Sequence, residues 1–184
     1  MFYLLSFLFT VYIYNKYVLP KNEKRKDLVE ISDFILDWLP TIDTSLPITL
    51  LSAINIFGLL WCMFSSYRQF VTGILMITFT IIVRSICLFL CPLKPHPKHI
   101  VLHDHLIKWI GKQTTPFVND LFFSGHLSVW LFLYHLSFHD PFWNLISIYG
   151  SISISLLLLL CKAHYVIDLF VAPFIVSTIF QMVK

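Results

Sequence analysis

Charged residues are scarce in this chain. Lysine, arginine, aspartate and glutamate make up 12% of its 184 residues, whereas hydrophobic residues make up 58%. A soluble domain has about 25% charged and about 45–50% apolar residues, and a small fold has too much surface to hide the excess. The net charge of +3 is too small to indicate nucleic-acid binding. We therefore predict an integral membrane protein with one domain over residues 1–184 and no nucleic-acid partner.

The sequence also lacks a disulfide framework. Its four cysteines all lie inside or at the ends of apolar runs, and none belongs to a Cys-x-x-Cys pair. We interpret them as small buried hydrophobic side chains. The amino terminus has neither the basic start nor the small-residue cleavage site of a signal peptide, so its apolar run is predicted to be a retained first span.

Long apolar segments are what the chain has in abundance. A membrane-spanning helix needs about 20 mostly apolar residues, and six segments reach or approach that length. We predict an all-α, six-helix membrane bundle that spans residues 2–19, 48–64, 70–91, 121–138, 142–161 and 165–183. Pro20 is expected to end the first span, and Tyr12, Tyr14 and Tyr17 are expected at its membrane interface. Six crossings place both chain ends on one face of the membrane.

Two connections are expected to lie on the membrane surface. From residue 28 to 39, apolar side chains recur at helical spacing with acidic residues between them, which predicts a short amphipathic helix. The connection 92–118 is rich in lysine and histidine, and within it residues 100–110 predict a basic helix on lipid headgroups. A solvated loop packed on the bundle is the alternative. The cluster of His96, His99, His103 and His105 matches no zinc spacing, so we predict no metal.

Residues capable of chemistry gather at one end of the predicted bundle. His164 and Asp168 are four residues apart, so their side chains can touch on one helix face. A carboxylate beside a histidine raises the basicity of the ring and selects the nitrogen that carries the proton. His126, at the start of the fourth span, and Arg84, near the end of the third, approach the same membrane face. For Arg84 we favour a phosphate-facing role over a structural partner or snorkelling, because an arginine inside a span costs about 3 kcal/mol or more.

Two histidines and an aspartate in a lipid-facing pocket can transfer a phosphoryl group. One histidine, held by the aspartate, can attack phosphorus and form a phospho-histidine, while the other protonates the leaving oxygen. Water or another alcohol then accepts the phosphoryl group, and nearby cations offset the charge of the transition state. This scheme needs no metal and no cofactor.

Two segments of the chain carry a family resemblance. The run 120–126, Asp-Leu-Phe-Phe-Ser-Gly-His, and the run 164–172, His-Tyr-Val-Ile-Asp-Leu-Phe-Val-Ala, resemble the catalytic motifs of the sphingomyelin synthase family, within the type 2 phosphatidic acid phosphatases. The resemblance implies a six-helix membrane fold and transfer of a phospho-headgroup from a phospholipid to ceramide or diacylglycerol. It implies that His164 is the nucleophile, Asp168 its orienting acid and His126 the acid for the leaving group.

Departures from the family pattern bear on the choice between its branches. Water-using lipid phosphatases carry an arginine six residues before the nucleophile, and Leu158 stands there in this chain, which favours the synthase branch. Lys162 is either a phosphate contact or an interfacial anchor. Asp120 matches an acid of the family and is otherwise predicted to be the N-cap of the fourth span. The candidates for phosphate binding are Arg84, Asp120, Ser124, Gly125 and Lys162.

Two other functions fit the same residues. One is a lipid phosphatase or phospholipase C-like hydrolase with water as the acceptor, and the other is a lipid-binding membrane scaffold without turnover. The lysines and arginines near the span ends favour a cytoplasmic active face, whereas the resemblance implies a luminal or exterior one, which we adopt. The headgroup, the acceptor, the organelle and the oligomeric state are left open.

Overall fold

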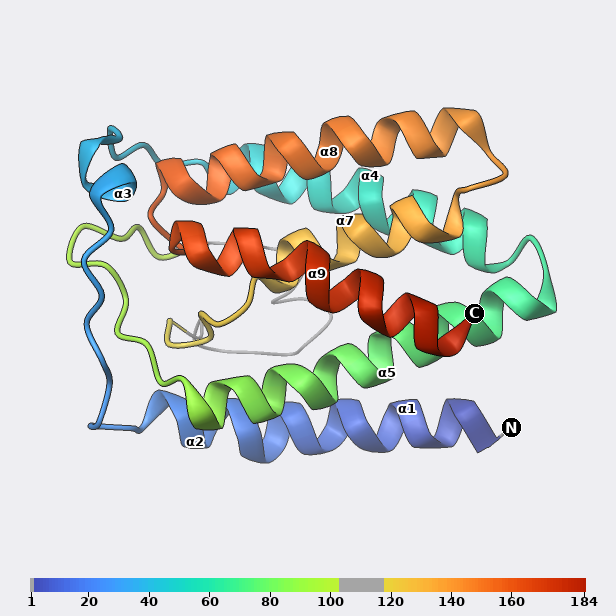
Figure 1. Cartoon of the computed structure of the whole chain (residues 1–184), viewed down its shortest axis with the longest axis horizontal. Coiled ribbons are helices and arrows are strands. Elements are labelled where there is room, and N and C mark those ends of the chain that lie inside the picture. Colours follow the sequence, from blue (N-terminus) through green and yellow to red (C-terminus); the bar gives the residue numbers. More distant parts are fainter. Residues whose placement is uncertain (1, 103–117) are drawn as a thin grey trace.

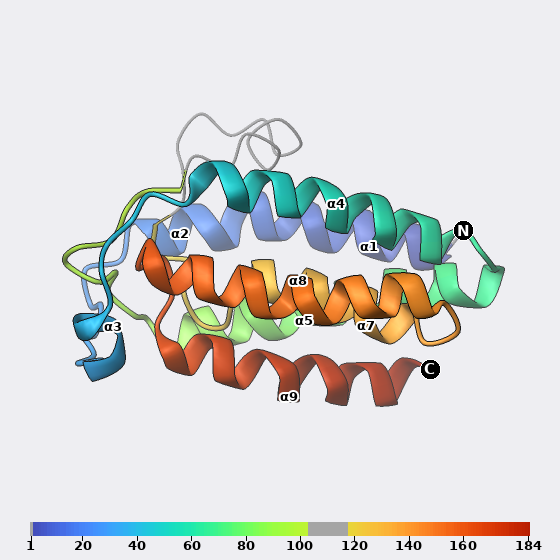
Figure 2. The same ribbon diagram turned by 90° about the horizontal axis from the view of Figure 1, so that it is seen from above.

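The fold is a bundle of helices, as predicted. The structure is a computed structural model that describes residues 2–102 and 118–184. Within these ranges the regular elements are helices, apart from one parallel bridge between Val29 and Leu93. Figures 1 and 2 show the long helices running side by side, with both chain ends at one end of the bundle. The prediction of an all-α membrane protein with its termini together is confirmed.

Five helices in the described part of the chain are long and apolar enough to cross a membrane. Four of them are continuous α-helices whose ends lie within three residues of the predicted spans: α4 (Ser45–Met63), α5 (Tyr67–Leu90), α8 (Pro141–Leu160) and α9 (Val166–Val183). The fifth is the amino-terminal helical segment, Phe2–Glu23. Long apolar runs are therefore enough to place these helices.

The predicted fourth span, 121–138, is too long. The helix at this position, α7 (Gly125–Leu136), has 12 residues and covers about 18 Å of an apolar layer about 30 Å thick. Residues 121–124 are not helical, and the Ser124 hydroxyl caps α7 by accepting a hydrogen bond from Leu127 N at 3.4 Å. A count of six full-length spans is therefore not confirmed. α7 lies inside the bundle against α4, α8 and α9 (Figure 1).

The first span is longer and less regular than predicted. α1 (Phe2–Ile13) continues through the π-helical turn η1 (Tyr14–Val18) into α2 (Leu19–Glu23). Pro20 does not end this helix, because it lies in the first turn of α2, where the missing backbone N–H of a proline is tolerated. The segment packs along α5 at the edge of the bundle (Figure 1).

The amphipathic surface helix is present but short. It is α3 (Phe34–Trp38), and the preceding residues 28–33 are not helical as predicted. Instead this stretch pairs with the segment after α5, where Val29 N donates to Pro92 O at 2.7 Å. The Phe34 and Trp38 side chains are exposed, as expected of apolar residues at lipid headgroups. Most of the predicted basic helix, 100–110, lies outside the described residues.

Polar side chains tie α3 to the start of α9. Asp33 Oδ1 accepts from Leu36 N at 3.0 Å, and Oδ2 accepts from Val166 N at 2.9 Å. The Lys162 ammonium, in the loop between α8 and α9, donates to the Leu36 carbonyl. The surface helix is thus attached to the loop that carries His164.

Gly150 allows α8 to approach α7 closely. A Cβ atom at position 150 would lie 2.0 Å from Trp130 Cζ3, so the buried Trp130 ring would have to shift to make room for it. We expect Gly150→Ala to lower the free energy of unfolding by about 2 kcal/mol, measured by denaturation in detergent micelles. The matched control is Ser151→Ala, since the Ser151 hydroxyl bonds back to the Ser147 carbonyl of its own helix. An equal loss in the control would show that the contact with Trp130 is not the cause.

Candidate active site

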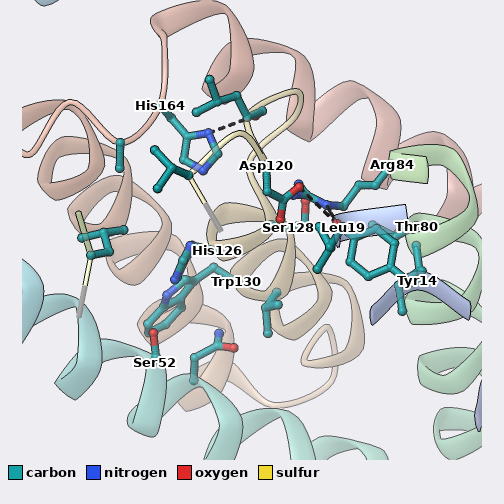
Figure 3. Close-up of a pocket in the computed structure, with 18 of the residues that line it drawn as sticks. Tyr14, Leu19, Ser52, Thr80, Arg84, Asp120, His126, Ser128, Trp130 and His164 are labelled. Atoms are coloured by element: carbon teal, nitrogen blue, oxygen red, sulfur yellow. Dashed lines mark hydrogen bonds and ion pairs between the residues drawn. The ribbon is translucent and has the colours of Figure 1, made fainter. Parts of the chain in front are cut away.

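A pocket of about 440 Å³ is lined by both His126, in the first turn of α7, and His164, just before α9. Its walls come from η1, α2, α4, α5, α7, the segments 95–102 and 118–121 and the loop before α9, and its volume is that of a small-molecule site. Six of the residues predicted from the sequence line it: Arg84, Asp120, Gly125, His126, Lys162 and His164. Figure 3 shows His126 and His164 in this hollow, with Arg84, Asp120 and Tyr14 on one side of it.

The predicted contact between His164 and Asp168 is present. His164 Nδ1 lies 3.3 Å from Asp168 Oδ2 and 3.0 Å from the Leu121 carbonyl oxygen. The contact does not arise from one helix face, because His164 precedes the first residue of α9 by two positions. Asp168 instead reaches back over the helix start, where Oδ2 also accepts from Tyr165 N at 3.0 Å. The carboxylate is fully buried, so it holds a defined position behind the histidine ring.

These partners decide which nitrogen of His164 carries the proton. Both groups at Nδ1, a carbonyl and a carboxylate, are hydrogen-bond acceptors, so Nδ1 is the N–H donor. In the neutral ring the lone pair is then on Nε2. Figure 3 shows this second ring nitrogen directed toward the side of the pocket where His126 lies. The arrangement suits a nucleophile or a base that acts through Nε2.

Arg84 has a structural partner, and one nitrogen of its guanidinium has no hydrogen-bond partner among the described residues. Its guanidinium pairs with Asp120 at 2.5 Å and donates from Nε to the Tyr14 hydroxyl at 3.3 Å. The side chain is 7% exposed, and the nitrogen that lacks a hydrogen-bond partner among the described residues is Nη1. The predicted structural partner of Arg84 is therefore present. The phosphate-facing role of Arg84 stays a prediction.

Asp120 is not the N-cap of the fourth span, which was its alternative interpretation. Ser124 caps α7, and the Asp120 carboxylate binds Arg84 and accepts from the Tyr14 hydroxyl at 3.1 Å. Tyr14 itself was assigned to the membrane interface, and this assignment is wrong. The π-turn η1 interrupts the α-helical register, and Tyr14 within it faces the pocket. No spacing in the sequence indicated this contact, which spans 106 residues.

The start of α7 brings Gly125 and His126 to the pocket. The backbone at Gly125 lies next to Arg84, since a Cβ atom at position 125 would lie 3.4 Å from Arg84 Nη1, an ordinary van der Waals contact. His126 follows in the first turn and is partly exposed to the pocket. Ser124, by contrast, is fully buried and does not line the pocket, and its oxygens serve the α7 cap and Ser128. Its predicted phosphate contact has no support in this arrangement.

Lys162 has its partners inside the protein. Its side chain is 2% exposed, and its ammonium donates to the Leu36 carbonyl and, at 3.1 Å, to the Leu39 carbonyl. These carbonyls are at the carboxyl end of α3, where a cation is favourable. The ammonium of Lys162 is therefore used inside the protein, and the geometry supports neither the predicted phosphate contact nor the predicted anchor in the membrane interface.

The histidine cluster that follows α5 does not form a metal centre in the described part of the chain. No group of three potential ligands occurs there. His96 is buried, and its Nε2 lies 3.0 Å from Asp37 Oδ1. His103, Asp104 and His105 lie outside the described residues. His135, elsewhere in α7, pairs with the Ser177 hydroxyl at 3.2 Å.

Comparison with known proteins adds no assignment. No family model matches the chain, and no curated protein matches it. The features that bear on function are therefore the geometry of the pocket and the two segments that contain His126 and His164.

Proposed function

We propose that this protein is a membrane lipid headgroup phosphotransferase of the sphingomyelin synthase type. It moves a phospho-headgroup from a phospholipid to ceramide or diacylglycerol through a phospho-histidine intermediate. The observation that carries the proposal is the His164 ring, whose Nδ1 is held by two acceptors and whose Nε2 is thereby the basic nitrogen in a pocket that also contains Arg84 and His126. In this proposal His164 is the nucleophile, Asp168 its orienting acid and His126 the acid for the leaving group.

The proposed reaction has two steps. The His164 Nε2 lone pair attacks phosphorus, the bond from phosphorus to the diacylglycerol oxygen breaks, and His126 gives that oxygen a proton. The acceptor hydroxyl then gives its proton to His126 and attacks phosphorus, and the phosphorus–nitrogen bond breaks. The guanidinium of Arg84 offsets the negative charge that develops on the phosphoryl oxygens. Asp168 stabilises the cationic histidine ring and keeps its orientation.

The walls of the pocket support a lipid substrate. Beyond the histidines, apolar side chains from three helices continue the lining, including Ile56 of α4, Ile77 of α5 and Phe132 of α7. An acyl chain fits such a surface, whereas a small water-soluble phosphate ester would leave it without contact. The proposed active end is the end with α3, in the luminal or exterior orientation that the resemblance implies.

Product analysis tests the proposal and separates it from hydrolysis. The purified protein is incubated in mixed phospholipid and ceramide vesicles, and the products are identified by mass spectrometry. A ceramide that has gained the phospho-headgroup, with an equal amount of diacylglycerol, is the expected result. Diacylglycerol with free phospho-headgroup and no modified acceptor would instead assign a phospholipase C-like hydrolase. An unchanged lipid profile in every vesicle would favour the third alternative, a lipid-binding membrane scaffold without turnover.

A further inference from the structure

Lys162 has a backbone conformation that favours glycine. It directly follows the C-cap residue of α8, and its φ of 56° lies in the left-handed region. Lys162 N donates to the Leu159 carbonyl at 3.1 Å and Ala163 N to the Leu158 carbonyl at 3.0 Å, which is the pattern of a helix closed by a left-handed residue. Glycine adopts this conformation without steric cost, whereas the Cβ atom of lysine makes it unfavourable. The advantage of lysine at this position must therefore come from its side chain.

The Lys162 side chain is buried and bound to another segment of the chain. Its ammonium donates to the carbonyls of Leu36 and Leu39. Burying an ammonium is unfavourable unless acceptors replace the water that it loses. Leu36 lies in α3 and Leu39 is the C-cap residue of that helix. A charged group inside the protein thus holds α3 at the end of the bundle where α8 ends and α9 begins (Figure 1).

Two further contacts join the same two parts of the chain. Before the loop between α8 and α9, Ile42 N donates to the Leu160 carbonyl at 2.9 Å. After the loop, Val166 N donates to Asp33 Oδ2 at 2.9 Å. The segment 33–42, which contains α3, therefore binds the chain before, within and after this loop. His164 lies two residues after Lys162 and two residues before Val166, so its backbone is held on both sides along the chain.

The His164 ring depends on two kinds of restraint. The Leu121 carbonyl and the Asp168 carboxylate contact Nδ1 and fix the direction in which the ring turns. The backbone decides how far Nε2 reaches into the pocket, and residues 161–165 belong to neither α8 nor α9. A displacement of about 1 Å at a reacting group can lower a rate about 10²-fold. A contact that holds this loop in place therefore has a large effect on a reaction at Nε2.

We propose that Lys162 is a positioning residue for His164. Its buried ammonium fastens the loop of His164 to α3 and thereby sets the place of Nε2 in the pocket. The proposal rests on the proposed function, in which Nε2 is the nucleophile, and adds to it a residue outside the reacting groups. Lys162 acts through His164, because its ammonium is bound to the carbonyls of Leu36 and Leu39.

Lys162→Met separates positioning from stability. Methionine fills much of the space of the lysine stem and leaves no unpaired charge, so the full chain should fold, as thermal unfolding in detergent will show. At a temperature at which the variant and the wild type are both folded, we expect the kcat of headgroup transfer to fall by about 10²-fold and KM to stay within about twofold. The matched control is Lys94→Met, which should keep both values, because the Lys94 side chain is half exposed and pairs with Glu30 at the surface.

Asp33→Asn tests the same attachment from the side of α3. The Asp33 carboxylate accepts from both Leu36 N and Val166 N, and an asparagine in its place has one acceptor oxygen for the two N–H groups. We expect a smaller fall in kcat than in Lys162→Met, again with KM unchanged. If Lys162→Met does not fold, Asp33→Asn takes its place in every measurement.

A measurement without turnover separates this proposal from the proposed function. The histidines of the full chain are isotopically labelled for NMR in detergent, and the signal of the His164 ring is identified by its loss in His164→Ala. Without any lipid substrate, we expect Lys162→Met to shift the His164 signal and to leave the signal of His135, on α7, unchanged. Lys94→Met should shift neither signal.

The remaining outcomes decide between the two proposals. A rise in KM with kcat unchanged would show that Lys162 contacts the substrate, and it would overturn the positioning role. An unmoved His164 signal would also overturn it, whatever happens to kcat, and so would a His135 signal that shifts as far as that of His164. If the His164 signal shifts but the wild-type protein transfers no headgroup, the transferase proposal fails and the link between Lys162 and His164 stands.

Discussion

Replacing His164 by alanine is expected to lower the rate of headgroup transfer by at least about 10⁴-fold. The reason is chemical, since the variant has no Nε2 atom to form the bond to phosphorus. The fold should persist, because the ring makes hydrogen bonds to Leu121 and Asp168 that contribute about 1 kcal/mol each. Initial rates in mixed vesicles measure the first effect, and thermal unfolding measures the second. Peptide mass spectrometry of the wild-type chain after donor addition should locate a phosphoryl group on His164.

A second histidine provides the control for this experiment. His135 lies on α7 outside the pocket and pairs with Ser177, so His135→Ala should keep the transfer rate within a few-fold. Asp168→Asn should lower the rate by about 10³-fold or more with the ring still present, because an amide no longer selects the Nδ1 proton and no longer stabilises the cationic ring. Full activity of the His164→Ala protein would show that His164 is not the nucleophile and that no phospho-histidine forms there.

The second large effect is expected at the Arg84–Asp120 pair, where activity and stability should separate. Arg84→Met should lower the transfer rate by about 10³-fold, because the developing charge on the phosphoryl group loses its cation. Asp120→Asn should have a smaller effect on the rate but a larger effect on stability, about 3 kcal/mol, since it leaves a buried cation without a counter-charge. The Asp120 side chain is 25% exposed and that of Arg84 is 7% exposed. In Arg84→Met the unpaired Asp120 carboxylate is therefore better solvated, and we expect a smaller loss of stability than in Asp120→Asn.

The double variant distinguishes a binding role of Arg84 from a purely structural one. Arg84→Met with Asp120→Asn removes both charges, so most of the stability lost in Asp120→Asn should return while the transfer rate stays low. Unfolding in detergent and transfer rates measure the two properties on the same samples. Asp27→Asn is the control, because it breaks the surface pair with Arg25 and should change the stability by less than about 1 kcal/mol. If activity recovered together with stability, Arg84 would be a structural residue and not a phosphate contact.

Local patterns account for the predictions that hold. The lengths of apolar runs predict α4, α5, α8 and α9 within three residues, because the bilayer requires each spanning helix to satisfy its own backbone hydrogen bonds. The same pattern fails at α7. There the chain is apolar enough for a long helix, but Ser124 caps it late and the preceding residues pack as a loop beside His164. Apolar composition cannot separate a buried loop from the end of a span, since both exclude water.

Some side-chain roles depended on contacts between distant segments. Lys162 and Tyr14 each looked interfacial, yet the first reaches the carbonyls of α3 and the second binds Asp120. The pairing of Arg84 with Asp120 joins α5 to the segment before α7. The two residues of each contact are far apart in the sequence, so no periodic pattern of residues could predict the contact.

The sequence by itself determined that this is an all-helical membrane protein and that two histidine segments meet at one end of it, because hydrophobic run length and side-chain spacing are local properties. Only the tertiary structure decided which nitrogen of His164 is basic, what shares the guanidinium of Arg84 and which buried polar groups lack partners. The physical reason is that hydrogen bonding in a low-dielectric interior is settled by where whole helices pack, and the packing of helices is a property of the assembled chain.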